Sequence, residues 1–263
     1  MEFCRVEREG HLLLVTIDRP RVMNALHRAA SDELDEVWSM YEADDELRVA
    51  ILSGAGDRSF CAGYDMREPT TASGDQSGGA YLANRHPRGL GGLTLRPTMP
   101  KPIVAAVNGM ALGGGLELAL ACDIIVAAEH AELGFPEPRV GRMALEGGMH
   151  RLARLVPLKL AMGMLLTGRR IPAAEAHRIG LVNEVVPLAD LLPAARRWAN
   201  QILECAPLSV QATKEAVMAG LGLPLPAAIA LVPGAMARAL VSEDQTEGVN
   251  AFLERRPPRW SGR

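Results

Sequence analysis

Glu117 is the residue whose surroundings most clearly require a chemical explanation. It lies in LGGGLELAL, where Leu116, Leu118, Ala119 and Leu120 make the expected helix apolar nearly all round. A helix of that kind is buried. Burial raises the pKa of a carboxyl group towards the range useful for proton transfer. Glu117 is therefore a candidate acid or base, and the structural alternative is a buried glutamate that pairs with an arginine from elsewhere in the chain.

A second carboxylate, Glu137, lies in LGFPEPRVG between Pro136 and Pro138. Each proline fixes its own φ and restricts the residue before it, so the loop is predicted to be stiff. A stiff loop is suited to precise positioning of a side chain. Alone, a glutamate in this setting is more often a surface acid than a catalytic one.

Two glycine-containing turns offer backbone N–H groups. Gly113, Gly114 and Gly115 follow a predicted strand and precede the helix of Glu117, where N–H groups and the helix start favour negative charge. A glycine turn that only lets helix and strand pack closely is the plainer explanation of GGG by itself. The spacing does not fit the dinucleotide-binding GxGxxG pattern. The second turn, DRSFCAGYD at 57–65, exposes N–H groups around Gly63 and is uninformative alone.

The elements that must position these residues are typical of an α/β protein. Short apolar runs predict four buried strands, at 12–17, 49–54, 103–107 and 123–127. A helix capped by Ser31 is predicted from apolar residues at i, i+3, i+4 and i+7, namely Leu34, Val37, Trp38 and Tyr41. Strands alternating with helices indicate right-handed connections and a largely parallel sheet.

The rest of the chain divides into a loop and a helical part. Residues 69–97 are rich in Gly, Pro, Ser and Thr and predict a substrate-covering loop with one short helix. After residue 155 the composition becomes helical, apart from a short strand at LVNEVV. Helices are expected near 188–204, 207–219 and 235–254, and the tail RRPPRWSGR is expected to be irregular.

Composition narrows the function classes. The chain has 263 residues, a net charge of −3 and 4% aromatic residues, so nucleic-acid and membrane-surface roles are not favoured. The N-terminus lacks the pattern of a signal peptide, and no apolar run is long enough to cross a bilayer. Four widely spaced cysteines without CxxC spacing predict reduced thiols, no zinc site and a cytoplasmic protein.

Taken together, these segments resemble the crotonase (enoyl-CoA hydratase/isomerase) superfamily along the whole chain. The motifs that carry the resemblance are TIDRPRVMNAL, SFCAGYD, VNGMALGGGLELALACD, FPEPRVG, GLVNEVVP and EGVNAFLERRPPRWSGR. Several ordered motifs at plausible spacing make chance similarity improbable. The resemblance implies a spiral of ββα units with two sheets, followed by a helical C-terminal region.

The resemblance also implies site residues. The backbone N–H groups of Tyr64 and Gly114 would form an oxyanion hole for the thioester oxygen, and Glu117 and Glu137 would position one water, add its hydroxyl at C3 and deliver a proton to C2. Further substrate-binding positions are implied by the same motifs: Arg58, Ala62, Gly63, Asp65 and Gly113. Arg58 stands where a basic residue often meets the CoA phosphates or adenine.

One segment departs from the family pattern. Where many hydratases read GxxPGxGGTQRL, this chain has GRMALEGGMHRL, with Ala144 and Leu145 in place of Pro and Gly and an additional acid, Glu146, near the expected acyl pocket. A salt bridge between Glu146 and a nearby arginine is the expectation, and a catalytic role is the alternative. Lys214 is expected on a solvated helix face.

The function expected from this resemblance is hydration of a 2-enoyl-CoA thioester, with no cofactor and no metal beyond the CoA of the substrate. The alternatives are an enoyl-CoA isomerase, a specialised hydratase of a catabolic route, or an acyl-CoA-binding protein without catalysis. Residues 1–195 would form the catalytic core and 196–263 a trimerisation region. The apolar C-terminal helices predict a homotrimer or a hexamer, with neither nucleic acid nor membrane as partner.

Overall fold

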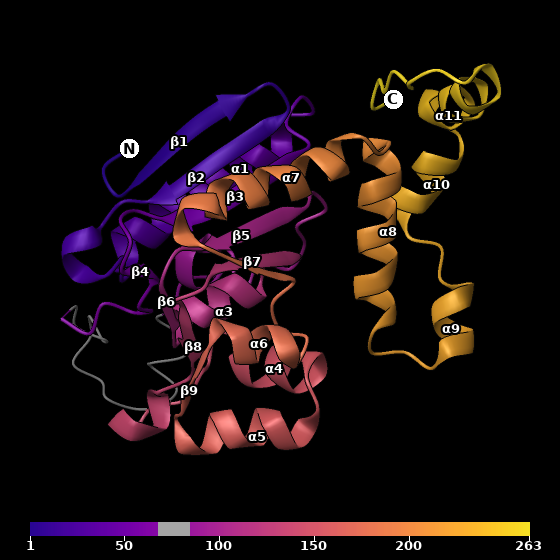
Figure 1. Ribbon diagram of the computed structural model, residues 1–263. Helices are drawn as coiled ribbons and strands as arrows, with labels where there is room; N and C mark the ends of the chain where they lie inside the picture. Colours follow the sequence, from indigo (N-terminus) through magenta and orange to yellow (C-terminus); the bar gives the residue numbers. More distant parts are fainter. Residues whose placement is uncertain (68–84) are drawn as a thin grey trace.

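The computed structural model describes residues 1–67 and 85–263, and its larger sheet orders its strands as the chain does (Figure 1). The six strands are β1 (Cys4–Glu9), β2 (Leu12–Ile17), β3 (Val49–Gly54), β5 (Ile103–Val107), β7 (Ile124–Ala128) and β10 (Glu184–Val186). The first two pair antiparallel, and every later pair is parallel. The expected α/β class with a largely parallel sheet is therefore confirmed.

A smaller sheet is built from four short strands, three of which directly follow strands of the larger one. They are β4 (Ser59–Cys61), β6 (Met110–Leu112), β8 (Glu132–Gly134) and β9 (Arg170–Pro172), in that order. Strands β4, β6 and β8 come directly after β3, β5 and β7 along the chain. The chain therefore passes repeatedly from the larger sheet to the smaller one, and each passage ends in a segment that approaches the candidate site.

Helices cover both faces of the larger sheet. The sequence alternation of β3 explains this, because Ala50 and Leu52 join one core cluster while Val49 and Ile51 join the other. Helix α1 (Arg28–Ala43) packs on the first cluster and α7 (Leu191–Leu203) on the second. The other helices of the body are α3 (Gly114–Leu120), α4 (Gly148–Leu155), α5 (Leu158–Thr167) and α6 (Ala173–Arg178), with short 3₁₀ turns η1 (Pro20–Val22), η2 (Leu90–Gly92), η3 (Glu137–Val140) and η4 (Leu188–Asp190).

Most element predictions are confirmed, but the bounds of one strand and the cap of one helix are corrected here. The strands predicted at 12–17, 49–54 and 103–107 have those bounds, and the fourth is shifted by one residue. Helix α1 is capped by His27, whose Nδ1 accepts from the Ala30 N–H at 3.0 Å, so the predicted Ser31 cap is wrong. Ser31 is instead buried and accepts from the Gly91 N–H at 3.1 Å. Of the 69–97 loop, residues 69–84 lie outside the described part, and η2 is the short helix in the remainder.

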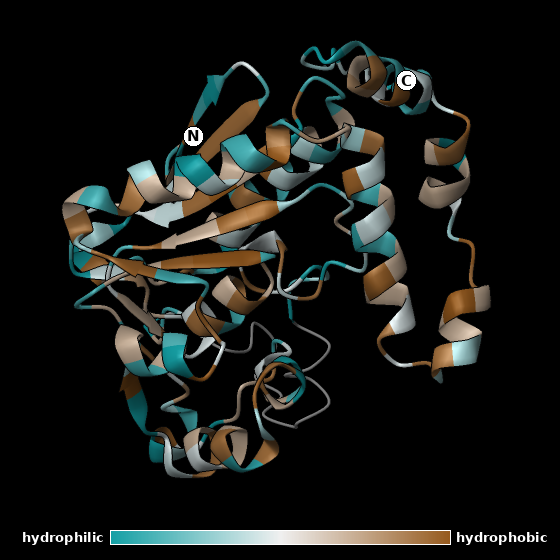
Figure 2. Ribbon diagram, turned by 45° about the vertical axis from the view of Figure 1, so that its right-hand side comes forward, coloured by the Kyte–Doolittle hydropathy of each residue, from teal (hydrophilic) through white to brown (hydrophobic). Residues whose placement is uncertain are grey.

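Four helices at the C-terminal end, called the arm below, project from the body (Figure 1). They are α8 (Pro207–Gly220), α9 (Leu225–Ala230), α10 (Gly234–Leu240) and α11 (Glu243–Glu254). The single helix predicted at 235–254 is thus two helices, because the chain turns at Val241 and Ser242, and the Ser242 hydroxyl caps α11. Figure 2 shows apolar stretches along the helices of the arm.

The junction between body and arm is polar. The Lys214 ammonium, on α8, donates to Asp123 Oδ2 at 2.6 Å and to the Lys101 carbonyl at 3.1 Å. With only 16% of its side chain exposed, Lys214 does not lie on a solvated face, and that expectation is wrong. The proposed division at residue 195 stays a prediction; α7 packs its residues Ala194, Ala195 and Ala199 against the sheet on both sides of that position. None of the described helices combines the length and apolarity needed to span a membrane.

Candidate active site

Glu117 is in the first turn of α3 and is 2% exposed. Its Oε1 accepts a hydrogen bond from the Gly148 N–H at 2.8 Å, and the backbone of Glu146, two residues earlier, lies close enough to lower the pKa of this carboxyl group. Burial raises the pKa of Glu117 to about 8, with smaller contributions from the charges of Glu137 and Glu146, and the donor at Gly148 opposes the rise. The predicted buried carboxylate is confirmed, and within the described part of the chain it is held by the backbone donor Gly148, not by an arginine.

Two glycines allow this arrangement. A Cβ on Gly115 would lie 1.8 Å from the Cys61 carbonyl oxygen, so only glycine lets α3 approach β4 this closely. A Cβ on Gly148 would lie 2.7 Å from the ring of Phe135 and 2.9 Å from Cγ of Glu117. The glycines of GGG and EGG therefore act as packing residues that bring Glu117 against the start of α4.

Glu137 approaches the same place from η3. It is the first residue of this turn, directly after Pro136, and burial raises the pKa of its carboxyl group. Within residues 1–67 and 85–263, its buried Oε2 has no hydrogen-bond partner. A Cβ on Gly113 would lie 2.9 Å from its Oε1, which places this carboxyl beside the start of α3. A buried carboxyl oxygen without a protein partner is oriented to meet something that binds there.

Backbone segments 63–64 and 113–114 meet beside these carboxyl groups. Gly63 has a φ of +91°, and a Cβ there would lie 2.9 Å from the Gly114 nitrogen. A Cβ on Gly114 would in turn lie 3.7 Å from the Tyr64 nitrogen. The two nitrogens that the sequence singled out are therefore neighbours, and Gly114 is the first residue of α3, where a helix N–H has no partner within its own helix.

The turn that carries Tyr64 is held in place by hydrogen bonds and ion pairs of the residues on either side of it. The Ala62 N–H donates to the Met23 carbonyl at 3.0 Å, and the Asp65 carboxylate pairs with Arg67 at 2.9 Å and with Arg19 at 3.2 Å. Hydrogen bonding and charge from Arg67, supported by Arg19, lower the pKa of Asp65 to about 2. Asp65 is thus an ionised brace of this turn. Arg58, by contrast, is exposed and lies directly before β4, the strand that leads into this turn.

Among the residues that the structure describes, Glu146 has no salt-bridge partner, so the expected salt bridge is not formed there. Its Oε2 accepts from the Leu90 N–H at 3.0 Å and from the Thr94 hydroxyl at 2.8 Å. Arg151 lies close by, but in the described chain its guanidinium donates to the backbone carbonyl of Glu146, at 3.2 Å, and to that of Thr94, at 2.8 Å. Backbone and hydroxyl donors have taken the place that a cation was expected to fill.

Sequence reasoning missed the residues that hold the site together. Asn24 is fully buried, with a φ of +55°, and its amide donates to the carbonyls of Ala55 at 3.0 Å and Ser59 at 2.7 Å. It thereby joins the turn before α1 to the strand before Tyr64. The asparagine of MNAL was the available signal, because a polar residue within an apolar stretch must find buried partners. Gly148 and Arg151 had no comparable signal in the sequence.

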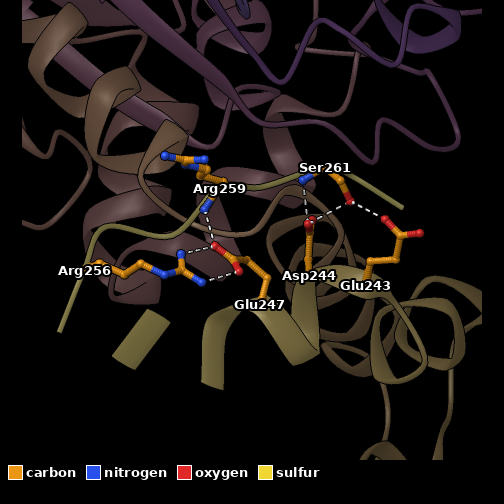
Figure 3. A pocket seen from close by; sticks show the side chains of 6 residues that line it. All are labelled: Glu243, Asp244, Glu247, Arg256, Arg259 and Ser261. Carbon is orange, nitrogen blue, oxygen red and sulfur yellow. Dashed lines mark hydrogen bonds and ion pairs between the residues drawn. The ribbon is translucent and has the colours of Figure 1, made fainter. Parts of the chain in front are cut away.

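A hollow on the arm is separate from this site. Figure 3 shows its lining side chains, which are Glu243, Asp244, Glu247, Arg256, Arg259 and Ser261. Arg256 pairs with Glu247 at 2.6 Å, and the Ser261 N–H donates to Asp244 at 2.6 Å. These contacts fold the C-terminal tail back on α11, so the polar groups of the hollow serve the arm's own structure.

Comparisons with known proteins agree along the whole chain. The family model described as enoyl-CoA hydratase/isomerase matches residues 7–263. An (E)-benzylidenesuccinyl-CoA hydratase from Thauera aromatica is 41% identical, covering 98% of both chains. A carnitinyl-CoA dehydratase from Escherichia coli K12 is 40% identical, covering 100% of this chain and 99% of the relative. The crystal structure of an enoyl-CoA hydratase from Mycobacterium tuberculosis H37Rv superposes with a TM-score of 0.89 at 38% identity and covers both chains completely.

Proposed function

Because the chain belongs to the enoyl-CoA hydratase/isomerase family, we propose that it adds water across the C2=C3 double bond of a 2-enoyl-CoA thioester. It is an enzyme of the hydratase and dehydratase type that acts on CoA thioesters, and its fold is the crotonase fold. The observation that carries the proposal is a pair of carboxyl groups with raised pKa values, the buried Glu117 and the partly buried Glu137, beside the neighbouring nitrogens of Tyr64 and Gly114.

The reacting state of the pair holds one proton. The ionised carboxylate accepts a proton from water as the hydroxyl bonds to C3, and the electrons of the double bond move onto the thioester oxygen as an enolate. The other carboxyl group, still protonated, then gives its proton to C2. The pair gains one proton and loses one, so the net change is the addition of one water, and the raised pKa values keep a proton on the pair near neutral pH.

The nitrogens of Tyr64 and Gly114 are proposed to donate to the thioester oxygen as it gains charge. Fixed donors of this kind each lower a barrier by about 3–4 kcal/mol. The proposed substrate-binding residues Ala62, Gly63 and Gly113 contribute backbone to the same turns. Asp65 contributes by holding the first turn, since its carboxylate is already paired. Arg58 is exposed, as a residue that meets CoA phosphates or adenine must be.

The proposal is tested with a panel of acyl-CoA esters, followed by loss of enoyl-thioester absorbance and by product mass. The expected result is loss of absorbance with a product heavier by one water. A shifted double bond at unchanged mass would identify an isomerase instead. Tight binding of every ester without turnover would identify a binding protein.

A further inference from the structure

Two loops that lie more than fifty residues apart in sequence meet around one carboxylate oxygen. The turn Gly89–Thr94 encloses Oε2 of Glu146, which accepts from the Leu90 N–H and the Thr94 hydroxyl. A Cβ on Gly89 would lie 2.5 Å from this oxygen and 2.1 Å from the Thr94 hydroxyl, so the turn is closely fitted to the carboxylate. Thr94 is fully buried and Leu90 is 4% exposed, so water does not compete freely for these bonds.

Each end of this contact reaches the candidate site. Leu90 touches the start of α3, because a Cβ on Gly114 would lie 2.5 Å from its Cδ2. The main chain of Glu146 lies beside the Glu117 carboxylate, two residues before Gly148, whose N–H donates to that carboxylate. One residue therefore contacts the wall beside the proposed thioester-oxygen site through its side chain and a proposed acid–base residue through its main chain.

We propose that Glu146 is a positioning residue, which locks the Leu90–Thr94 turn to the backbone that holds Glu117 and so fixes the proposed acid–base residue relative to the Gly114 nitrogen. This rests on the hydration proposed above. The hydrogen bonds of Arg151 to the carbonyls of Glu146 and Thr94 brace the same two loops independently. Loss of the Glu146 carboxylate should therefore loosen the site without unfolding the chain.

The charge of Glu146 has a second effect that can be separated from its hydrogen bonds. The charged groups that face Glu117 are Glu137 on η3, Glu146 before α4 and Arg151 on α4. The negative charge of Glu146 raises the pKa of Glu117. Removing that charge lowers this pKa, so the activity that depends on a protonated Glu117 is lost at a lower pH.

Three variants separate the two effects. Glu146→Gln removes the charge but keeps an amide oxygen that can accept both hydrogen bonds. Glu146→Ala removes both the charge and the acceptor. Thr94→Val removes one donor and leaves the charge. The matched control is Glu36→Ala, which truncates an exposed glutamate of α1.

The measurement is kcat and KM for an enoyl-CoA that the wild type hydrates, as a function of pH. We expect Glu146→Ala to lower kcat by about 10- to 100-fold, the size of effect caused by a small misplacement of reacting groups. Glu146→Gln should keep kcat within about threefold at its optimum, since its acceptor is retained. Both should lose activity at a lower pH than the wild type as the pH is raised. Thr94→Val should lower kcat without changing the pH at which activity is lost.

Two results would overturn the positioning role. One is a Glu146→Ala enzyme with the kcat and pH profile of the wild type. The other is a Glu146→Gln enzyme as damaged as Glu146→Ala, which would make the carboxylate itself a reacting group. Should Glu146→Ala not fold, Thr94→Val and Glu146→Gln still decide the question. Failure of the hydration proposal would look different, because the wild type itself would then add no water to any ester.

Discussion

The loops around Glu117 and the helices of the arm differ in what they bury: the loops enclose polar groups, and the helices expose apolar side chains. Around Glu117, the carboxylates of Glu117 and Glu146 accept hydrogen bonds from the chain itself, donated by Gly148, Leu90 and Thr94. On the arm, apolar side chains are left in solvent: Ile229 is 74% exposed, Val241 83% and Phe252 81%.

The difference shows that one chain by itself supplies the hydrogen bonds around Glu117 but does not cover the apolar surface of the arm. Buried hydrogen-bonded groups fix one geometry, which catalysis requires. A large exposed apolar surface is a liability unless another surface covers it. We therefore expect substitutions near Glu117 to change rates and substitutions on the arm to change assembly, and each prediction below tests one side of that contrast.

The largest expected effect is on turnover. Glu117→Gln and Glu137→Gln should each lower kcat by about 10²–10⁴-fold, because an amide cannot exchange a proton at neutral pH. The fold and CoA-ester binding should persist, since the change is nearly isosteric. Steady-state kinetics measures the loss, and circular dichroism checks the fold.

The double variant sharpens this result. Both carboxyl groups act on one water, so the combined loss should be far smaller than the product of the two single losses. Near-wild-type turnover of both single variants on every enoyl-CoA tested would contradict the two-glutamate mechanism.

Glu117→Gln, which lowers turnover, should make the folded protein more stable than the wild type at high pH. The pKa of Glu117 is raised from 4.5 to about 8 in the folded state, so this group lowers stability progressively as pH rises between those values. Glu117→Gln lacks this loss. The free energy of unfolding of the variant minus that of the wild type should therefore be about 2–3 kcal/mol larger near pH 9 than near pH 6, which means a relatively more stable variant at high pH. Denaturant unfolding at fixed protein concentration measures it, and a pH-independent difference would show that Glu117 is not held protonated.

The pH dependence of turnover is the third test. Above about pH 8 the carboxyl group of Glu117 is ionised, so the proton that it holds at neutral pH is no longer available for C2. The rate should then fall about tenfold for each further pH unit. A rate that stays constant up to pH 10 would mean that the proton comes from another group.

The smallest expected effect is a change in the mass of the assembled protein, caused by a substitution on the arm. We propose that the arm's apolar surface is covered in a homotrimer or in a hexamer, so light scattering should give about three or six times the mass of one chain. Phe252→Asp should lower that mass while leaving the fold of the body unchanged. A monomer at micromolar concentration would contradict the proposal.

The sequence predicts the strands and the buried helix of this fold better than it predicts where helices begin and end. The apolar runs at 12–17 and 49–54 predict strands because burial on both faces leaves one interpretation. Glu117 is predictable for the same reason, since few structural roles explain an acid in an apolar helix. The helix cap at His27 and the break at Val241 are not, because several nearby residues suit each turn.

Long-range partners are the part that sequence spacing cannot supply. Glu146 was expected to pair with an arginine, yet its partners, Leu90 and Thr94, lie 56 and 52 residues away. Lys214 likewise finds Asp123 across 91 residues. Only the assembled sheet brings these groups together, and no local pattern in the sequence encodes that proximity.

The strand order of the larger sheet has a consequence for how the protein is made. As the chain leaves the ribosome, β2, β3, β5, β7 and β10 emerge in the order in which they pair. Each new strand therefore meets the open edge left by the strand before it in the sheet, and no later segment must be threaded between strands already joined. The growing domain can extend vectorially from its N-terminal hairpin. The arm can dock only at the end, because Asp123 must first be fixed beside β5 before Lys214 has a partner.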